Sequence, residues 1–479
     1  MMKMDKENIC FMSASEMAEK IKTQELTSLE ITEVIIERIE KINPIINAYC
    51  TPTFDIAREM ANKADDLVKK GEKIGLLNGI PTSIKDLMQT KGIRTTYGSR
   101  LYKDFIPEQD DIAVQRLMEA GCVILGKTNT PAFGHIALTN NKIFGETKTP
   151  WDIEKNSGGS SGGAASSVAS GLGPLALGSD GGGSIRIPSS CCGVYGLKPT
   201  FGRIPSYPHI GIAFKSMDHY GPIVRYVKDA ALMLNIMKGP HPADNNSFLD
   251  DCIDYVGSLE EKPKKLKIGY STTLGFGKAL EDEVRENILD NVQKFEQFDW
   301  EVEEAKIKIR NPDLAFKTLV CIGYAYDLQK EFSKKPEDFD PDLIAMIRLG
   351  LDNNSMNIGK ANEIRNRLYE VMYQYFKDFD LLITPTTPCS AFKPGWLDSG
   401  TAFPTIGNKS LNITSWMTFT YPFNMTGLPA ASIPSGWDSS GLPIGMQIVG
   451  KRYDEKTVLQ VSKAFEEIAP WQEKRPKFD

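Results

Sequence analysis

The residues best suited to chemistry lie in one Gly- and Ser-rich stretch, residues 157–193. Two glycine clusters, at 158–163 and 178–184, lie on either side of an alanine-rich segment and a short apolar run. A flexible linker would not carry an apolar strand and a small-residue helix between its glycines. We therefore interpret the stretch as part of a site in which serine hydroxyls are candidate nucleophiles.

Three chemistries compete for this stretch. A phosphate-binding loop would fit the spacing of Gly178 and Gly183, but Ser184 stands where that loop needs a lysine. The dinucleotide-binding pattern G-x-G-x-x-G does not occur. The hydrolytic motif G-x-S-x-G does occur, centred on Ser160, and it matches again one step later at Ser161. The hydrolytic interpretation therefore needs a base for its serine.

Histidine is the usual base, and the four histidines of this chain have no context that singles one out: His135, His209, His219 and His241. A lysine can serve instead if burial makes it neutral. With an ordinary pKa of about 10.4, about one lysine in a few thousand is neutral at pH 7. Lowering that pKa by about three units costs about 4 kcal/mol. Lys85 suits such burial, because residues 77–86 are apolar and shaped by Gly and Pro. An ordinary surface lysine beside Asp86 is the open alternative.

Several ordered blocks around these residues match one known pattern. They are Gly79–Asp86, Gly158–Gly163, Gly178–Pro188, Cys192–Thr200, Asp218–Pro222, Thr384–Pro388 and Asn424–Pro429. In this order and spacing they resemble the amidase signature family, over roughly residues 10–465. The resemblance implies that family's α/β fold, with a mixed central β-sheet between layers of α-helices.

The resemblance also implies a catalytic triad. By motif position Ser184 is the nucleophile, Ser160 a bridging serine on a cis peptide bond, and Lys85 the base. Ser184 would attack a carboxylic amide, release ammonia or an amine, and leave a covalent acyl-enzyme that water hydrolyses to the acid. No metal or organic cofactor is required.

The glycine cluster beside Ser184 implies an oxyanion hole. Backbone N–H groups of Gly181, Gly182, Gly183 and Ser184 can converge on the developing oxyanion, because glycines let a backbone approach closely. Gly181 departs from the Thr, Ile or Ser that the family carries there. Three neighbours have structural roles in this interpretation: Asp180 and Arg186 as a buried ion pair, and Ser161 as a hydrogen-bonding loop residue.

Two substrates are open within this family. A glutaminase A subunit of a tRNA-dependent amidotransferase needs charged groups for the ammonium and carboxylate of glutamine. Here Met417 occupies the position of its aspartate, and Ala345-Met346 aligns with its arginine pair, although Arg348 lies two residues away. We therefore favour a small neutral amide, apolar or aryl, with Cys321, Tyr324 and Met417 as candidate pocket residues.

A third possibility is a non-catalytic binding or assembly protein on the same fold. The intact set of Lys85, Ser160 and Ser184 argues against it.

Composition limits the partners. Among 479 residues, 56 basic and 62 acidic residues give a net charge of 56 − 62 = −6, which argues against a nucleic-acid partner. Eight cysteines without a CxxC pair favour a reducing compartment. The N-terminus has charges where a signal peptide needs apolar residues, and no apolar run could span a membrane. We expect a cytoplasmic protein without a membrane partner, and take a homodimer as the working hypothesis.

The elements that must position the site follow from periodicity. We predict one domain over residues 1–479, with 1–70 as an N-terminal helical layer on the α/β core. Capping boxes at Ser13 and Thr27 begin two of these helices, Pro44 ends the second, and a third covers about 55–70. Further on we predict a helix over 111–120, a helical face over about 280–295, and strands over 121–126, 174–178, 266–270 and 300–309. Residues 310–420 are the hardest to assign.

Overall fold

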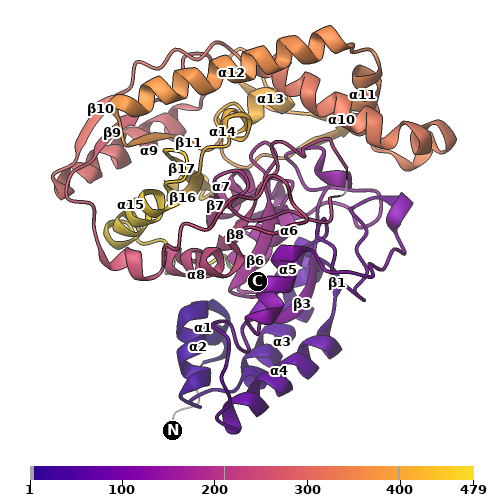
Figure 1. Cartoon of the computed structure of the whole chain (residues 1–479), viewed down its shortest axis with the longest axis vertical. Coiled ribbons are helices and arrows are strands. Elements are labelled where there is room, and N and C mark those ends of the chain that lie inside the picture. The colour runs from indigo at the N-terminus through magenta and orange to yellow at the C-terminus, as the bar shows by residue number, and fades with distance from the viewer. Residues whose placement is uncertain (1–4, 210, 398–399, 479) are drawn as a thin grey trace.

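The chain is built around a mixed β-sheet of eleven strands (Figure 1). The structure is a computed structural model, and it describes residues 5–209, 211–397 and 400–478. From edge to edge the strands are β1 (Tyr49–Pro52), β3 (Val123–Thr128), β2 (Pro81–Lys85), β6 (Leu175–Ser179), β8 (Tyr220–Val224), β7 (Tyr195–Lys198), β16 (Ala430–Trp437), β17 (Pro443–Gly450), β11 (Leu381–Pro385), β9 (Lys267–Tyr270) and β10 (Glu301–Glu304). β2 is parallel to β3 and β6, whereas β6 is antiparallel to β8. The predicted mixed sheet is confirmed.

Helices cover both faces of this sheet. Side chains of a strand alternate between faces, and Ala176 of β6 packs with the alanines of α6 (Gly162–Ala169). Its neighbours Leu175 and Leu177 belong to the core on the other face, with the apolar residues of α8 (Val227–Met237). Further helices of the α/β core include α5 (Ile112–Glu119), α9 (Asp282–Gln293) and α15 (Glu455–Ile468). The predicted layers are therefore present.

The N-terminal segment contains α1 (Lys6–Phe11), α2 (Ala14–Lys22), α3 (Ser28–Ile46) and α4 (Phe54–Lys69). Thr27 and Glu30 form the predicted capping box, and Ser13 Oγ accepts from the N–H of Glu16. Two predictions here are wrong. α3 continues through Pro44 to Ile46, because a proline this close to a helix end removes only one hydrogen bond. Residues 49–52 form edge strand β1, antiparallel to β3, so the segment is not entirely helical.

The region that periodicity left unassigned is mostly helical. It contains α10 (Asp313–Lys334), α11 (Pro341–Leu351), α12 (Ser355–Asp378) and α13 (Ile413–Trp416), and α14 (Tyr421–Thr426) follows it directly. α10 to α12 lie together at the end of the molecule away from α1 to α4 (Figure 1). The strand predicted over 300–309 is shorter, because only 301–304 pair with a neighbour, in parallel with β9. Short strand pairs form between 148–149 and 152–156, between 395–397 and 400–402, and between 405–406 and 409–410.

Two parallel strands bring the site residues together. β2 ends at Lys85 and β6 ends at Ser179, and Ile84 pairs with Leu177 between them. Ligands of such sheets bind at the carboxyl ends of the parallel strands, where the following loops meet. The turn at 180–185 leads from β6 into α7 (Arg186–Cys192), and Ser160 lies just before α6. The sheet therefore places Lys85 and both serine-bearing turns together at the carboxyl ends of β2 and β6.

Within the described ranges, none of the helices combines the length and apolarity needed to cross a bilayer.

A glycine substitution tests how α6 is seated. A Cβ on Gly163 would lie 2.3 Å from the backbone nitrogen of Asn129 and 2.6 Å from the carbonyl oxygen of Ala48. Because backbone atoms cannot move aside, Gly163→Ala should lower the free energy of unfolding by about 2 kcal/mol, measured by urea denaturation. Gly359 in α12 is the matched control, since nothing lies within 4 Å of its added Cβ. Gly359→Ala should raise stability by about 0.5–1 kcal/mol. Equal effects of the two substitutions would contradict this packing.

Candidate active site

Lys85 is the buried amine at the centre of the site. Its side chain is 0% exposed, and Nζ lies 2.7 Å from Ser160 Oγ and 3.0 Å from Ser179 Oγ. Burial lowers the pKa of Lys85 to about 7, against the opposing effect of two nearby carboxylates. Burial therefore favours the neutral, proton-accepting form of this amine. The alternative of a surface lysine beside Asp86 is wrong, because Asp86 is itself buried and accepts hydrogen bonds from Thr96.

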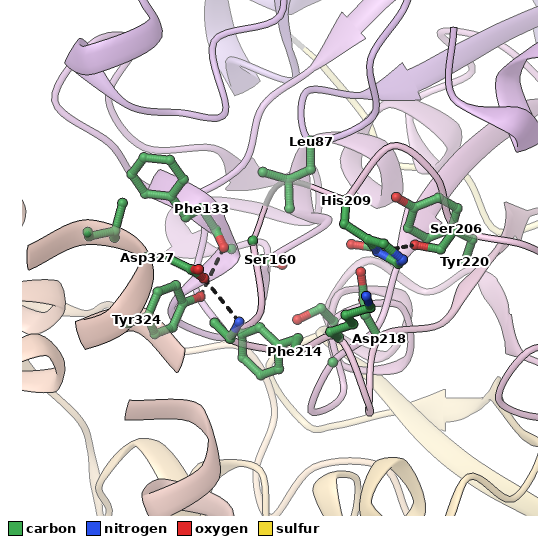
Figure 2. Close-up of a pocket in the computed structure, with 18 of the residues that line it drawn as sticks. Leu87, Phe133, Ser160, Ser206, His209, Phe214, Asp218, Tyr220, Tyr324 and Asp327 are labelled. Atoms are coloured by element: carbon green, nitrogen blue, oxygen red, sulfur yellow. Dashed lines mark hydrogen bonds between the residues drawn. The ribbon is translucent and has the colours of Figure 1, made fainter. Parts of the chain in front are cut away.

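Ser160 and Ser184 open on the same pocket. The peptide bond before Ser160 is cis, as the resemblance implies. Ser160 Oγ accepts the hydrogen bond from Lys85, whereas Ser184 Oγ has no hydrogen-bond partner within the described residues. Figure 2 shows Ser160 in the middle of the pocket, between Phe133 on one side and His209 on the other. Both hydroxyls are thus accessible to a molecule in the pocket.

Ser161 holds the two serine-bearing turns together. Its backbone N–H donates to the carbonyl oxygen of Ser184 at 3.1 Å, and its Oγ donates to the carbonyl oxygen of Ser179 at 3.1 Å. Ser161 Oγ also accepts from the N–H of Ser179 at 3.4 Å. Since Ser161 is 0% exposed and these three bonds all go to backbone, it has the geometry of the loop residue we predicted.

The glycine turn offers fewer oxyanion donors than predicted. The N–H groups of Gly181, Gly182 and Ser184 donate to no acceptor within the described residues. The N–H of Gly183 instead donates to Asp180 Oδ1 at 2.7 Å, so in this structure it is not free for an oxyanion. Gly183 has a φ of 134°, which favours glycine, and a Cβ there would lie 2.3 Å from Thr420 Oγ1. Gly183 therefore shapes the turn.

Asp180 and Arg186 form the predicted buried ion pair. Both side chains are 0% exposed, and two hydrogen bonds of 2.9 Å join the guanidinium to the two carboxylate oxygens. Burial raises the pKa of Asp180, but the charge and hydrogen bonds of Arg186 outweigh it and hold that pKa well below its usual range. Arg186 also donates to Thr420 O, Gln447 Oε1 and Asn424 Oδ1. The pair fixes the glycine turn to the C-terminal third of the chain.

Among the described residues, no histidine is positioned as a base for Ser160 or Ser184. Within the described residues, none of the four histidines hydrogen-bonds to Ser160 or Ser184. His219 is buried with Nδ1 3.1 Å from Asp180 O, and His135 Nδ1 lies 2.8 Å from Ala132 O. His209 lines the pocket and pairs with Ser206 at 3.4 Å. A Ser-His triad is therefore not formed.

The three predicted pocket residues lie in three different places. Tyr324 of α10 lines the pocket, and its hydroxyl donates to Phe133 O at 2.9 Å. Met417 lines an adjoining apolar cavity on the other side of Ser184. Cys321 lines neither, because it is buried where α10 packs against Gly350 of α11.

Sequence reasoning missed two residues beside the lysine. Ser179 bonds to the amine of Lys85 directly, and its place just before Asp180 in a matching block was an available signal. Asp218 lines the pocket, where burial raises the pKa of its carboxyl and Lys85 opposes that rise. Asp218 also lay in a matching block, but nothing local in the sequence indicates that its carboxyl lies near enough to influence Lys85.

The sequence model of the Amidase family matches residues 30–459. The chain belongs to the amidase signature family. This amidase is 36% identical to an acylamidase of Rhodococcus erythropolis, over 99% of this chain and 98% of the relative. It is 37% identical to the A subunit of the glutamyl-tRNA(Gln) amidotransferase of Carboxydothermus hydrogenoformans, over 98% and 99%. Among solved structures, a bacterial aryl acylamidase of this family superposes with a TM-score of 0.90 at 31% identity, covering 97% of each chain. The protein is an amide-hydrolysing enzyme.

The ion pair yields a stability prediction for this amidase. Asp180→Asn leaves the guanidinium of Arg186 buried without its counter-charge and should cost about 3–5 kcal/mol at pH 7, measured by urea denaturation. Because the folded-state pKa of Asp180 is lowered, its stabilisation is present above the ordinary pKa of about 4 and is lost as pH falls further. The difference between variant and parent should therefore shrink in acid.

The matched control is the exposed pair of Lys393 and Glu154, whose side chains are 69% and 62% exposed. Glu154→Gln should leave the urea midpoint unchanged. An Asp180→Asn protein as stable as its parent would refute the structural role of the pair.

Proposed function

We propose that this amidase cleaves its substrate through Lys85, Ser160 and Ser184. The observation that carries the proposal is the 2.7 Å contact between the buried Lys85 amine and Ser160 Oγ, in a pocket that also exposes Ser184. Neutral Lys85 takes the proton of Ser160 Oγ as Ser160 takes that of Ser184. Ser184 Oγ then bonds to the amide carbon, whose oxygen becomes an oxyanion.

The remaining steps use the same groups. The N–H groups of Gly181, Gly182 and Ser184 stabilise the oxyanion. When the intermediate collapses, the C–N bond breaks and the nitrogen leaves with a proton returned from Lys85 through Ser160. Water then attacks the acyl-Ser184 ester, with the relay again removing a proton, and releases the acid. Every proton taken by Lys85 is returned in the same half-reaction.

We propose a small, neutral, apolar or aryl amide as substrate. Met417 and Met346 line the apolar cavity beside Ser184, whereas Arg348 is exposed on α11. Glutamine would find no ion pair for its carboxylate at these positions. The names of the acylamidase and aryl acylamidase relatives agree with this choice. The glutaminase A subunit is the alternative, and the intact Lys85–Ser160 contact argues against a non-catalytic protein.

We also propose a cytoplasmic location. All eight cysteines are free thiols in the structure, and all but Cys252 are buried, which suits a reducing compartment. A homodimer stays our hypothesis for assembly.

The pH dependence of kcat/KM tests the base. Since Lys85 acts when neutral and its pKa is about 7, activity should be full well above pH 7. It should be halved near pH 7 and fall about tenfold per pH unit below. Lys85→Met should lower kcat by about a thousandfold or more, and Ser184→Ala likewise. Ser161→Ala is the control and should stay within about tenfold of the parent, with circular dichroism confirming the fold of each variant. A Lys85→Met enzyme with parental turnover would refute the mechanism.

Substrate assays separate the two family alternatives. The chain alone should release aniline from acetanilide, with kcat/KM at least about a hundredfold above that for L-glutamine, because an apolar cavity leaves the charges of glutamine unpaired. Glutaminase activity that appears only with a partner subunit would favour the alternative.

A further inference from the structure

Ser184 lies between two cavities. We name the first the polar chamber: its lining includes Ser160, Ser179, Asp218, Tyr324, Asp327 and Leu328. The second is the apolar chamber, whose lining includes Ile136, Phe316, Val320, Met346 and Met417. Gly134, Phe214 and Ser184 line both and therefore form the boundary.

The proton relay opens on one chamber only. Ser160 and Ser179 line the polar chamber, and neither lines the apolar chamber. The glycine turn spans the boundary, since Gly181 faces the polar chamber and Gly182 the apolar one. A carbonyl carbon bound to Ser184 Oγ, with its oxygen at this turn, therefore has one remaining substituent on each side.

The proton relay determines which substituent of the carbonyl carbon lies in which chamber. Given the proposed mechanism, the departing nitrogen must receive its proton from Ser160 Oγ within hydrogen-bond reach. The nitrogen and its substituent must then lie in the polar chamber. The acyl group, on the opposite side of the carbonyl carbon, enters the apolar chamber.

The residues that line each chamber indicate which chemical group it can bind. In the polar chamber the rings of Phe214 and Tyr324 meet edge to face at 5.8 Å (Figure 2), and the carboxyl of Asp218 also lines it. The carboxyl of Asp327 lines it too, but its Oδ2 already accepts from the N–H groups of Ile212 and Ala213. Ammonia would leave the two rings without a contact, whereas an aromatic amine would pack against them and place a donor group near Asp218.

The apolar chamber offers no free charge within its described lining. Lys317 and His135 both line it, but Lys317 is paired with Asp313 at 3.2 Å, and His135 is bonded to Ala132 O. A charged acyl group would be desolvated there without a partner.

We propose that the substrates are N-substituted amides, with an aromatic amine in the polar chamber and an uncharged apolar acyl group in the apolar chamber. This inference rests on the proposed function and adds the identity and placement of the two substituents. Acyl preference and amine preference are then set by different residues and can be changed one at a time.

Helix α10 supplies a matched pair of test positions. Val320 and Leu328 are both aliphatic and buried, at 1% and 6% exposed, and they line the apolar and polar chambers respectively. The substrates are acetyl, butyryl and hexanoyl 4-nitroanilides, which share the amine, and acetamide, acetanilide and 4-hydroxyacetanilide, which share the acyl group. The readout is kcat/KM of each variant on each substrate.

Val320→Ala should raise the hexanoyl-to-acetyl ratio about tenfold and leave the amine ratios within about twofold. Leu328→Ala should change the acetanilide-to-acetamide ratio about tenfold and leave the acyl ratios within about twofold. Because all acetyl substrates give the same acyl-enzyme, the effect of Leu328→Ala should also be confined to acylation, measured as the burst of released amine.

The opposite pattern, or equal changes of both ratios in both variants, would overturn the chamber assignment while leaving the amidase mechanism intact. A parent enzyme that prefers acetamide to every anilide would overturn the aromatic amine. If no amide in the panel is cleaved by the parent, the proposed function fails and the assignment with it. Should either alanine variant unfold, Met346→Ala and Tyr102→Ala repeat the test from the less buried ends of the two chambers.

Discussion

The burial of one amine is the constraint on which the site depends. Lys85 lies at the end of β2, between β3 and β6, with no solvent access. Keeping this amine neutral near pH 7 costs about 4 kcal/mol relative to a solvated lysine. The cost is tolerated because the sheet is large and because two serine hydroxyls bond to the amine. A smaller or looser core would admit water and return the amine to its charged form.

A second buried charge gives the site its shape. The ion pair of Asp180 and Arg186 is fully buried, and its remaining hydrogen-bonding capacity is used by the glycine turn on one side and by 420–447 on the other. Such pairs contribute little net stability compared with apolar residues, but removal of one partner is costly. The arrangement therefore fixes one geometry of the turn. It draws the N–H of Gly183 away from the pocket and leaves those of Gly181, Gly182 and Ser184 without an acceptor among the described residues.

The boundary between the two chambers follows from the same turn. Neighbouring glycines face opposite sides, so one short segment serves both halves of an amide. The chamber with the proton relay is polar because the relay and its carboxylate neighbours line it. The chamber on the other side is apolar because α10, α11 and the segment before α14 contribute side chains such as Val320, Met346 and Met417. Their meeting requires residues that lie far apart along the chain.

The sequence alone determined the ordered blocks, hence the family and the mixed α/β sheet, and motif position predicts Lys85, Ser160 and Ser184 as the triad. Local composition did not distinguish Lys85 from other buried lysines. Lys127 and Lys198 are also 0% exposed, have lowered pKa values and lie beside Gly or Pro. Local composition therefore selects all three, and only the tertiary structure places one of them against a pocket serine. Three other features could not be predicted from the sequence: the hydrogen bond from the N–H of Gly183 to Asp180, the strand at 49–52, and the separation of Tyr324 from Met417. Each depends on contacts made in the folded chain, and the spacing of residues along the sequence does not give their distance in space.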